Sequence, residues 1–187
     1  MGKLIYFMRT SLDGYIADDG DSDWSAPNEE AFAFITDLHR PIGTYLYGRK
    51  EYETMAVWET PEVISDLTKA MLEDFARIWQ AADKIVYSKS LETVSTPKTR
   101  LEREFDPQAV RDLKAHLPHD VSVAGPNLAA QAIRAGLVDE YHLLVVPTML
   151  GRGIRVLPGD VRTGLDLLDE RRLANGMVYL RYQTQAF

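Results

Sequence analysis

The stretch that most constrains this chain runs from Val121 to Glu140. It consists of a short apolar run, a turn at Gly125, a helical pattern that begins at once, and a stop signal at Gly136. The apolar run 141–146 follows directly and predicts another strand. A strand that passes through glycine into a helix makes an anion site, because unpaired N–H groups and the helix dipole point at one place. Taken alone, the stretch fits either a dinucleotide pyrophosphate site or an ordinary strand–turn–helix unit.

Composition removes several classes of function. The chain has 187 residues, which suits one domain, and its net charge of −7 argues against non-specific nucleic-acid binding. The absence of cysteine excludes disulfides, thiolate zinc sites and a cysteine nucleophile, and the four histidines show no metal-ligand spacing, so we expect no metal. The N-terminal apolar run is too short for a signal peptide, and no run is long enough to span a membrane. A cytoplasmic protein is the expectation.

The remaining chain alternates strand and helix patterns. Strands are expected at 4–8, 44–47, 84–87 and 99–105, and helices follow at about 28–38, 61–82 and 107–116. Residues 18–23 are acidic and predict an exposed loop, and the helix 61–82 has an inner face that includes Val63 and Ile64. Two last strands, 165–173 and 177–187, meet at Asn175-Gly176, a strong hairpin signal.

This order of elements predicts the fold class. Parallel strand–helix units followed by an antiparallel hairpin predict an α/β protein with three layers, in which helices cover both faces of a mixed, mostly parallel sheet. No linker or repeat interrupts residues 1–187, so a single domain is expected. The apolar strand 141–146 and the strand-rich C-terminus could support a subunit interface, which makes a homodimer the expected assembly.

Several short segments together resemble the dihydrofolate reductase-like family. The closer likeness is to the branch that contains the reductase domain of bifunctional riboflavin-biosynthesis deaminase-reductases. The segments occur in order over nearly the whole chain, at 11–17, 47–53, 86–89, 123–128, 136–147 and 180–182. The resemblance implies that fold, NADPH as cofactor, and hydride transfer to a small heterocycle that is pterin-like or pyrimidine-like.

The resemblance also implies where the cofactor is bound. The turn Gly48-Arg49-Lys50 resembles the family's phosphate-binding turn, since an Arg fork suits a phosphate, although a solvated basic turn would have the same sequence. Ser88 and Lys89 resemble the pair that favours the 2′-phosphate of NADPH over NADH.

Two further segments complete the implied cofactor site. Ile16 and Ala17 resemble the loop that covers the nicotinamide. Ala124-Gly125 takes the place of the family's glycine pair, which is often joined by a cis peptide. The stretch that follows offers backbone N–H groups, except at its proline, which has none; the residues are Gly125, Pro126, Asn127 and Leu128.

Two residues depart from the family pattern. Ala124 replaces a glycine, which brings the phosphate approach closer to a side chain. Glu51 stands where dihydrofolate reductases have a threonine that hydrogen-bonds the cofactor. A carboxylate there repels phosphate unless it turns away or pairs with Arg49 or Lys50.

The proton donor is less determined by sequence. Glu29 or Glu30 lies in the region of the first-helix acid that orients and protonates the substrate in dihydrofolate reductase, with Trp24 and Phe34 as candidate substrate contacts. Acids at a helix start also serve simply as dipole partners. Asp13 is a third candidate catalytic acid, although Asp13-Gly14 equally forms a turn. The expected function is an NADPH-dependent reductase, and the alternative is a dinucleotide-binding or regulatory homodimer of the same fold without turnover.

Overall fold

A computed structural model describes residues 2–17, 23–61 and 67–185, and it is built on an eight-stranded sheet. The strand order is β5-β4-β3-β6-β1-β7-β10-β9. The strands from β5 to β7 run parallel, whereas β10 is antiparallel to β7 and β9 is antiparallel to β10. The sheet comprises β1 (Leu4–Ser11), β3 (Ile42–Gly48), β4 (Asp83–Tyr87), β5 (Thr99–Glu102), β6 (Asp120–Ala124), β7 (Glu140–Val146), β9 (Leu165–Arg172) and β10 (Val178–Thr184).

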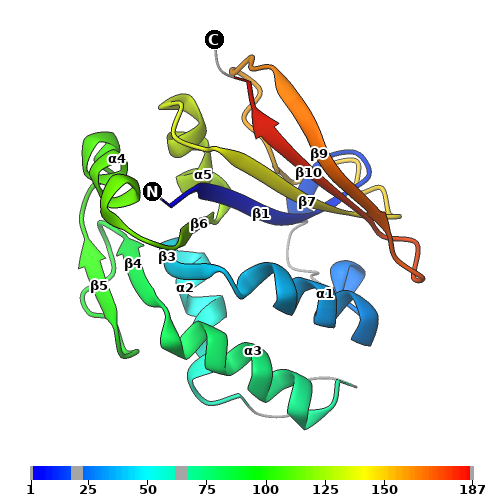
Figure 1. Ribbon diagram of the computed structural model, residues 1–187, viewed down its shortest axis with the longest axis horizontal. Helices are drawn as coiled ribbons and strands as arrows, with labels where there is room; N and C mark the ends of the chain where they lie inside the picture. The colour runs from blue at the N-terminus through cyan, green and yellow to red at the C-terminus, as the bar shows by residue number, and fades with distance from the viewer. Residues whose placement is uncertain (1, 18–22, 62–66, 186–187) are drawn as a thin grey trace.

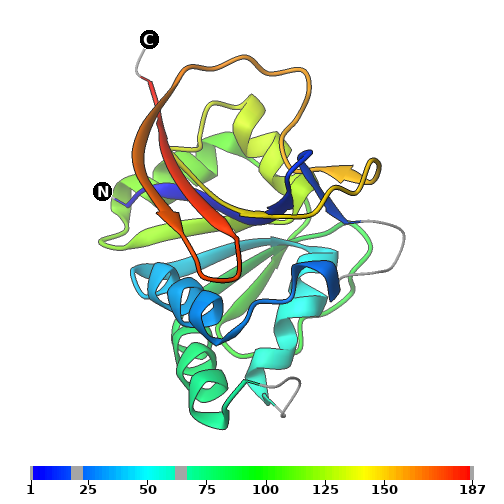
Figure 2. The same cartoon turned by 90° about the vertical axis from the view of Figure 1, so that its right-hand side faces the viewer.

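Helices cover both faces of this sheet (Figures 1 and 2). The first face carries α1 (Glu29–His39), α2 (Arg49–Met55) and α3 (Lys69–Ala81), and the second carries α4 (Pro107–His116) and α5 (Pro126–Arg134). A small second sheet pairs β2 (Tyr15–Ala17) with β8 (Ile154–Arg155), and two short 3-10 helices are η1 (Asp23–Ser25) and η2 (Ala56–Glu59). The predicted fold class, three layers with a mixed sheet, is therefore confirmed.

The core follows from side-chain alternation along the buried strands. In β3, Tyr45 and Tyr47 pack on the α1/α3 side, whereas Leu46 packs on the α4/α5 side. In β1, Ile5 lies on the first side and Tyr6 on the second. Because successive side chains of a strand point to opposite faces, each strand contributes to two separate apolar cores, one on each side of the sheet.

Local sequence explains most element boundaries. Asn28 caps α1 by accepting a hydrogen bond from the Ala31 N–H at 3.0 Å. Asp106 caps α4 in the same way, and Pro107 follows at the first position of that helix. Gly136 has a φ of +62°, so the helix stop expected there is confirmed.

Two predictions needed correction. The helix expected from residue 61 begins at Lys69, because Thr68 caps it; Val63 and Ile64 lie outside the described residues, as do positions 18–22 of the expected loop. The strand β8 lies between β7 and β9, where no strand was predicted. The predicted hairpin is confirmed, with Leu173 and Met177 paired through a 2.9 Å backbone hydrogen bond on either side of the turn 174–176.

Neighbouring strands β3 and β6 send the chain in opposite directions. After β3 the chain continues through helices on the first face to β4, and after β6 it continues through α5 on the second face to β7. The carboxyl ends of these two strands therefore form a topological switch point, which is where ligands bind in open α/β sheets. Among the described residues, no helix is long and apolar enough to cross a membrane.

Candidate functional site

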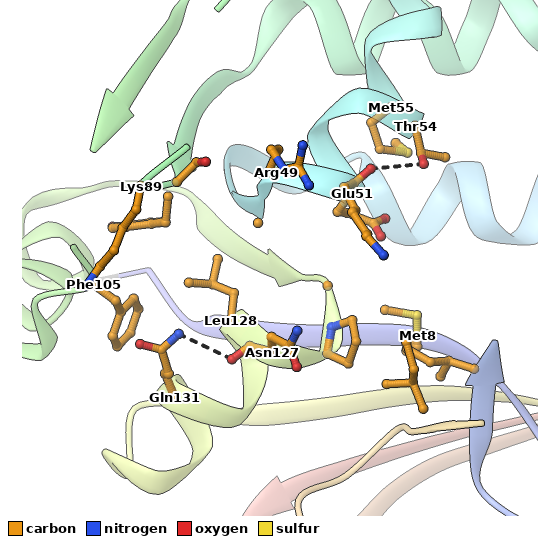
Figure 3. Close-up of a pocket in the computed structure, with 18 of the residues that line it drawn as sticks. Met8, Arg49, Glu51, Thr54, Met55, Lys89, Phe105, Asn127, Leu128 and Gln131 are labelled. Atoms are coloured by element: carbon orange, nitrogen blue, oxygen red, sulfur yellow. Dashed lines mark hydrogen bonds between the residues drawn. The ribbon is translucent and has the colours of Figure 1, made fainter. Parts of the chain in front are cut away.

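A cleft of about 880 Å³ opens at this switch point. Figure 3 shows Arg49 and Glu51 on α2 across from Asn127 and Leu128 on α5, with Lys89 towards one end. The cleft brings together ten of the predicted cofactor residues: Ile16, Gly48, Arg49, Lys50, Ser88, Lys89, Gly125, Pro126, Asn127 and Leu128. Ala124 does not line it, and the side chain of Ala17 lies outside the described part of the structure.

One wall is the turn from β6 into α5. Gly125 has a φ of +89°, a backbone conformation that side-chain-bearing residues rarely adopt, and its carbonyl accepts the Ala129 N–H at 2.9 Å. The N–H groups of Asn127 and Leu128 belong to the first turn of α5 and have no intrahelical acceptor. This wall can therefore donate hydrogen bonds to an anion. The Ala124–Gly125 peptide is trans, which differs from the cis bond implied by the resemblance; trans is the lower-energy form for a non-proline bond.

The two walls approach each other closely at Gly125. A Cβ atom placed on Gly125 would lie 3.4 Å from Glu51 Cβ and 3.8 Å from the Gly48 nitrogen. These distances put the start of α2 directly beside the start of α5. A ligand phosphate at the α5 N-terminus would therefore lie near Glu51 as well as near Arg49 and Lys50.

The outer end of the cleft carries exposed cations. Lys89 forms an ion pair of 3.5 Å with Glu104, and both side chains are about 80% exposed, so the pair holds Lys89 only weakly. The Ser88 hydroxyl oxygen accepts the Leu91 N–H at 3.0 Å, and Arg103 donates to the Ser88 carbonyl at 3.2 Å. A basic, hydroxyl-bearing end of this kind suits a phosphate group.

Aromatic rings lie next to these cations. The rings of Tyr87 and Phe105 are 5.5 Å apart in an edge-to-face arrangement, and both residues line the cleft. An aromatic surface beside bound phosphate can pack against a flat base. The outer end thus combines groups for a phosphate with groups for a heterocyclic ring.

The inner end of the cleft carries opposite charges on facing elements. Arg9, on β1, donates from Nη1 to the Ser25 carbonyl oxygen at 2.6 Å. Burial lowers the pKa of the Arg9 guanidinium, and burial raises the pKa of the Glu51 carboxyl, while the two charges each oppose the other's shift. Glu51 forms no ion pair with Arg49 or Lys50; Arg49 lies 3.7 Å from Glu53 one turn further along α2.

The acids predicted as catalytic lie away from the cleft lining. Glu29 is exposed on α1, and Glu30 accepts the Ala174 N–H at 2.8 Å, which ties α1 to the β9–β10 turn. Asp13 accepts the Ser11 hydroxyl at 2.6 Å and also the N–H groups of the 150–151 backbone. The bond from Ser11 lowers the pKa of Asp13 to about 2. Asp13 thus holds two loops together.

The aromatic residues predicted as substrate contacts also lie off the cleft. The ring of Phe34 packs edge-on against Tyr179 at 4.8 Å, beneath the Arg171 guanidinium. Trp24 packs against the core on the α1/α3 side, and its Nε1 is buried without a hydrogen-bond partner among the described residues. In the described ranges, no group of three or more His, Cys, Asp or Glu side chains is arranged so that it could hold a metal ion.

Sequence reasoning missed part of the cleft lining. Arg9 was visible as a charge inside an apolar strand pattern, which is a recognisable signal for a functional group. Arg103 and Phe105 had no such signal, because their position depends on how β5 ends beside β4. The missed lining residues include Met8, Arg9, Met55, Tyr87, Arg103, Phe105, Gln131 and Ile154.

The doubly wound sheet and the cleft at its switch point define an α/β domain with the dihydrofolate reductase-like fold. A family model described as the RibD C-terminal domain matches residues 2–179, and the chain belongs to this family. The YyaP protein of Bacillus subtilis (strain 168) is 29% identical over 194 residues, which cover 96% of this chain and 94% of that protein.

Solved structures support the same fold. A protein of Shewanella sp. PV-4 named for riboflavin biosynthesis superposes with a TM-score of 0.75 at 20% identity, covering 98% of this chain and 99% of that one. A pyrimidine reductase-like protein of Corynebacterium diphtheriae superposes with a TM-score of 0.68 at 16% identity, covering 100% of this chain and 93% of that one. A deaminase/reductase of Thermotoga maritima superposes with a TM-score of 0.67 at 15% identity, covering 98% of this chain and 57% of that one.

Proposed function

We propose that this protein is an NADPH-dependent reductase that transfers a hydride to a small planar heterocycle of the pyrimidine or pterin type. The observation that carries the proposal is the cleft, whose volume is about 880 Å³. In it, the N-terminus of α5 faces the cations of α2, and Lys89, which follows β4, lines the same cleft. Membership of the RibD C-terminal domain family supports a pyrimidine-type acceptor. So does the Thermotoga neighbour, named as a reductase of 5-amino-6-(5-phosphoribosylamino)uracil.

The residues of the cleft fit an extended dinucleotide. The N–H groups of Asn127 and Leu128 would bind its pyrophosphate, with Arg49 on the facing wall. Ser88 and Lys89 would bind the 2′-phosphate at the outer end.

The inner end would hold the reacting rings. Ile16 would contact the nicotinamide, and the acceptor would lie beyond it, towards Arg9. The bound dinucleotide would supply the hydride, and the protein would align the two rings and exclude water.

A fluorescence titration with NADPH and with NADH tests cofactor binding. Lys89→Gln should weaken NADPH binding about tenfold, which is about 1.4 kcal/mol, and should leave NADH binding nearly unchanged. Lys69→Gln is the matched control, because Lys69 is an exposed lysine on α3 that pairs with Glu73 outside the cleft. Failure of the unmodified protein to bind NADPH at millimolar concentration would contradict the reductase proposal.

The alternative is a dinucleotide-binding or regulatory homodimer without turnover. It gains support from the position of Glu29, Glu30 and Asp13, because none of these three acids lines the cleft. Following NADPH oxidation against a panel of pyrimidinones and pterins separates the two functions. Oxidation with any acceptor supports the reductase, whereas tight binding with no oxidation, together with a dimer in sedimentation, supports the alternative.

A further inference from the structure

Two acids line the cleft, and they stand at different places. Among the described lining residues, Glu51 and Glu104 are the two with carboxyl groups. Glu104 is 80% exposed and pairs with Lys89 at the outer end. Glu51 lies on the first turn of α2, beside Gly125, and makes no hydrogen bond or ion pair with any described residue. Of the two, Glu51 is therefore the carboxyl group whose oxygens are available to a ligand.

Ionisable groups surround Glu51 on three elements. On β1, the Arg9 guanidinium and the buried Tyr6 hydroxyl both interact electrostatically with this carboxyl, and on β3 the buried Tyr47 hydroxyl does so. On α2 itself, Arg49 and Lys50 line the same cleft, and the lining residues of α5 are uncharged. Arg9 is a cation that influences the carboxyl from another element, and its bond to the Ser25 carbonyl fixes the guanidinium in place.

We propose that Glu51 is the proton donor to the heterocycle reduced in this cleft, and that cofactor binding loads the proton onto it. The inference rests on the proposed function. Glu51 would then be the catalytic residue, with the Arg9 guanidinium as a charge that influences its carboxyl group without contacting it. This assigns to α2 the role that sequence alone gave to Glu29 or Glu30.

The reaction balances as follows. The acceptor carbon of a C=N bond gains a hydride, which is one hydrogen nucleus and two electrons, from a reduced nicotinamide dinucleotide. The π pair of that bond moves onto nitrogen, and the nitrogen takes the proton from a Glu51 carboxyl oxygen. The heterocycle is reduced by two hydrogens, the dinucleotide leaves oxidised, and Glu51 is left as a carboxylate that solvent reprotonates.

Loading of the proton follows from electrostatics. A phosphate held at the N-terminus of α5 places negative charge near Glu51, since the two walls are in contact at Gly125. Like charges in a cleft that excludes water disfavour the ionised carboxyl, so the bound cofactor raises the proton affinity of Glu51. Proton and cofactor binding are then linked, and each strengthens the other.

Isothermal titration calorimetry of NADPH binding tests this linkage without any turnover. Titrations in two buffers of different ionisation enthalpy, repeated from pH 5 to pH 8, give the number of protons taken up with the cofactor. At the pH where the difference is largest, the unmodified protein should take up as much as about one proton more per bound cofactor than Glu51→Gln does. Glu73→Gln, which changes an exposed glutamate on α3, should match the unmodified protein.

The outcomes separate this inference from the function on which it rests. Absence of NADPH binding overturns the proposed function itself. Binding with the same proton uptake in the unmodified protein and in Glu51→Gln overturns the role of Glu51 and leaves cofactor binding standing. A folded Glu51→Gln is confirmed by an unchanged circular dichroism spectrum.

The pH profile of turnover gives a second readout. With an acceptor from the panel, kcat of the unmodified protein should fall as pH rises, because the ionised Glu51 has no proton to donate. Glu51→Gln should lower kcat about 100-fold or more and remove this pH dependence, and Glu51→Asp should restore part of both. A Glu51→Gln enzyme with unchanged kcat and an unchanged pH profile would overturn the proposal.

Discussion

Two carboxyl groups beside arginines have opposite surroundings. Glu140, at the start of β7, is 2% exposed and accepts hydrogen bonds from Lys3 at 2.6 Å, His142 at 2.9 Å and two nitrogens of Arg181 at 2.8 and 3.1 Å. Glu51, on the first turn of α2 just after the carboxyl end of β3, has no such bond among the described residues. The bonds to Glu140, led by Arg181, outweigh its burial and lower its pKa to about 2, whereas burial raises the pKa of Glu51.

The difference shows how the same type of side chain is fully hydrogen-bonded within the fold in one place and left without a bond at a cleft in another. A buried carboxylate with every lone pair used has nothing left for a ligand, and removing it leaves its partners unpaired. A partly buried carboxyl that faces a cavity without a partner costs stability and keeps its oxygens for chemistry. Stability and reactivity measurements on the two residues should therefore diverge.

Glu140→Gln should have the largest effect on stability. The neutral amide cannot balance the positive charge of Arg181, and its NH₂ group would face nitrogens that are themselves hydrogen-bond donors. The free energy of unfolding should therefore fall by about 3–5 kcal/mol. Urea denaturation at pH 7 measures this loss. The control is Glu170→Gln on the exposed strand β9, which should change stability by less than about 0.5 kcal/mol. A loss as small as that of the control would show that the Glu140 network is not stabilising.

The pH dependence of stability should carry the signature of Glu140. Its folded pKa, about 2, lies below its ordinary value of 4.5, so its stabilisation is complete above pH 4.5 and is lost as pH falls towards 2. The contribution at stake is about 3 kcal/mol. The gap in unfolding free energy between the unmodified protein and Glu140→Gln should therefore narrow from pH 6 to pH 3. A gap that stays constant over this range would contradict the lowered pKa.

The comparison also shows what the sequence could determine. The fold class and the Gly136 stop follow from patterns along the chain, and both were predicted. The turns at Gly48 and Gly125 were predicted to bind phosphate from the family resemblance, and the cleft brings the two turns together.

The rest depended on contacts between distant segments. Which acid faces the cleft is set by how α1 and α2 lie on the sheet, and spacing along the chain contains no such information. Glu30 was a candidate acid because the family resemblance places a catalytic acid in its region, yet its carboxylate accepts the Ala174 N–H, 144 residues away. Glu51 was noted only as a departure that repels phosphate, because nothing in its own segment shows that its carboxyl lines the cleft within the electrostatic influence of Arg9 on β1.

Gly125→Ala probes the backbone beside Glu51 separately from its charge. The φ of +89° is strained for alanine, whereas the added Cβ has room, with its nearest contact at 3.4 Å. The strain should lower the unfolding free energy by about 1–2 kcal/mol. Gly159→Ala is the control, because Gly159 has open space and no positive φ. Equal stability of both variants would show that the turn relaxes without cost.

Glu51→Gln should have the smallest effect on stability, and its sign should be opposite to that of Glu140→Gln. The folded pKa of Glu51 is raised, so the folded state binds its proton more tightly than the unfolded state does. The ionised group therefore costs stability as pH rises above 4.5, and that cost is absent at lower pH. Glu51→Gln should be more stable than the unmodified protein at pH 8, by less than about 1 kcal/mol, and equal to it near pH 4. Urea denaturation at both values measures the change. A loss of stability at pH 8 comparable to that of Glu140→Gln would mean that Glu51 is a structural carboxylate after all, held by Arg9 as Glu140 is held by Arg181.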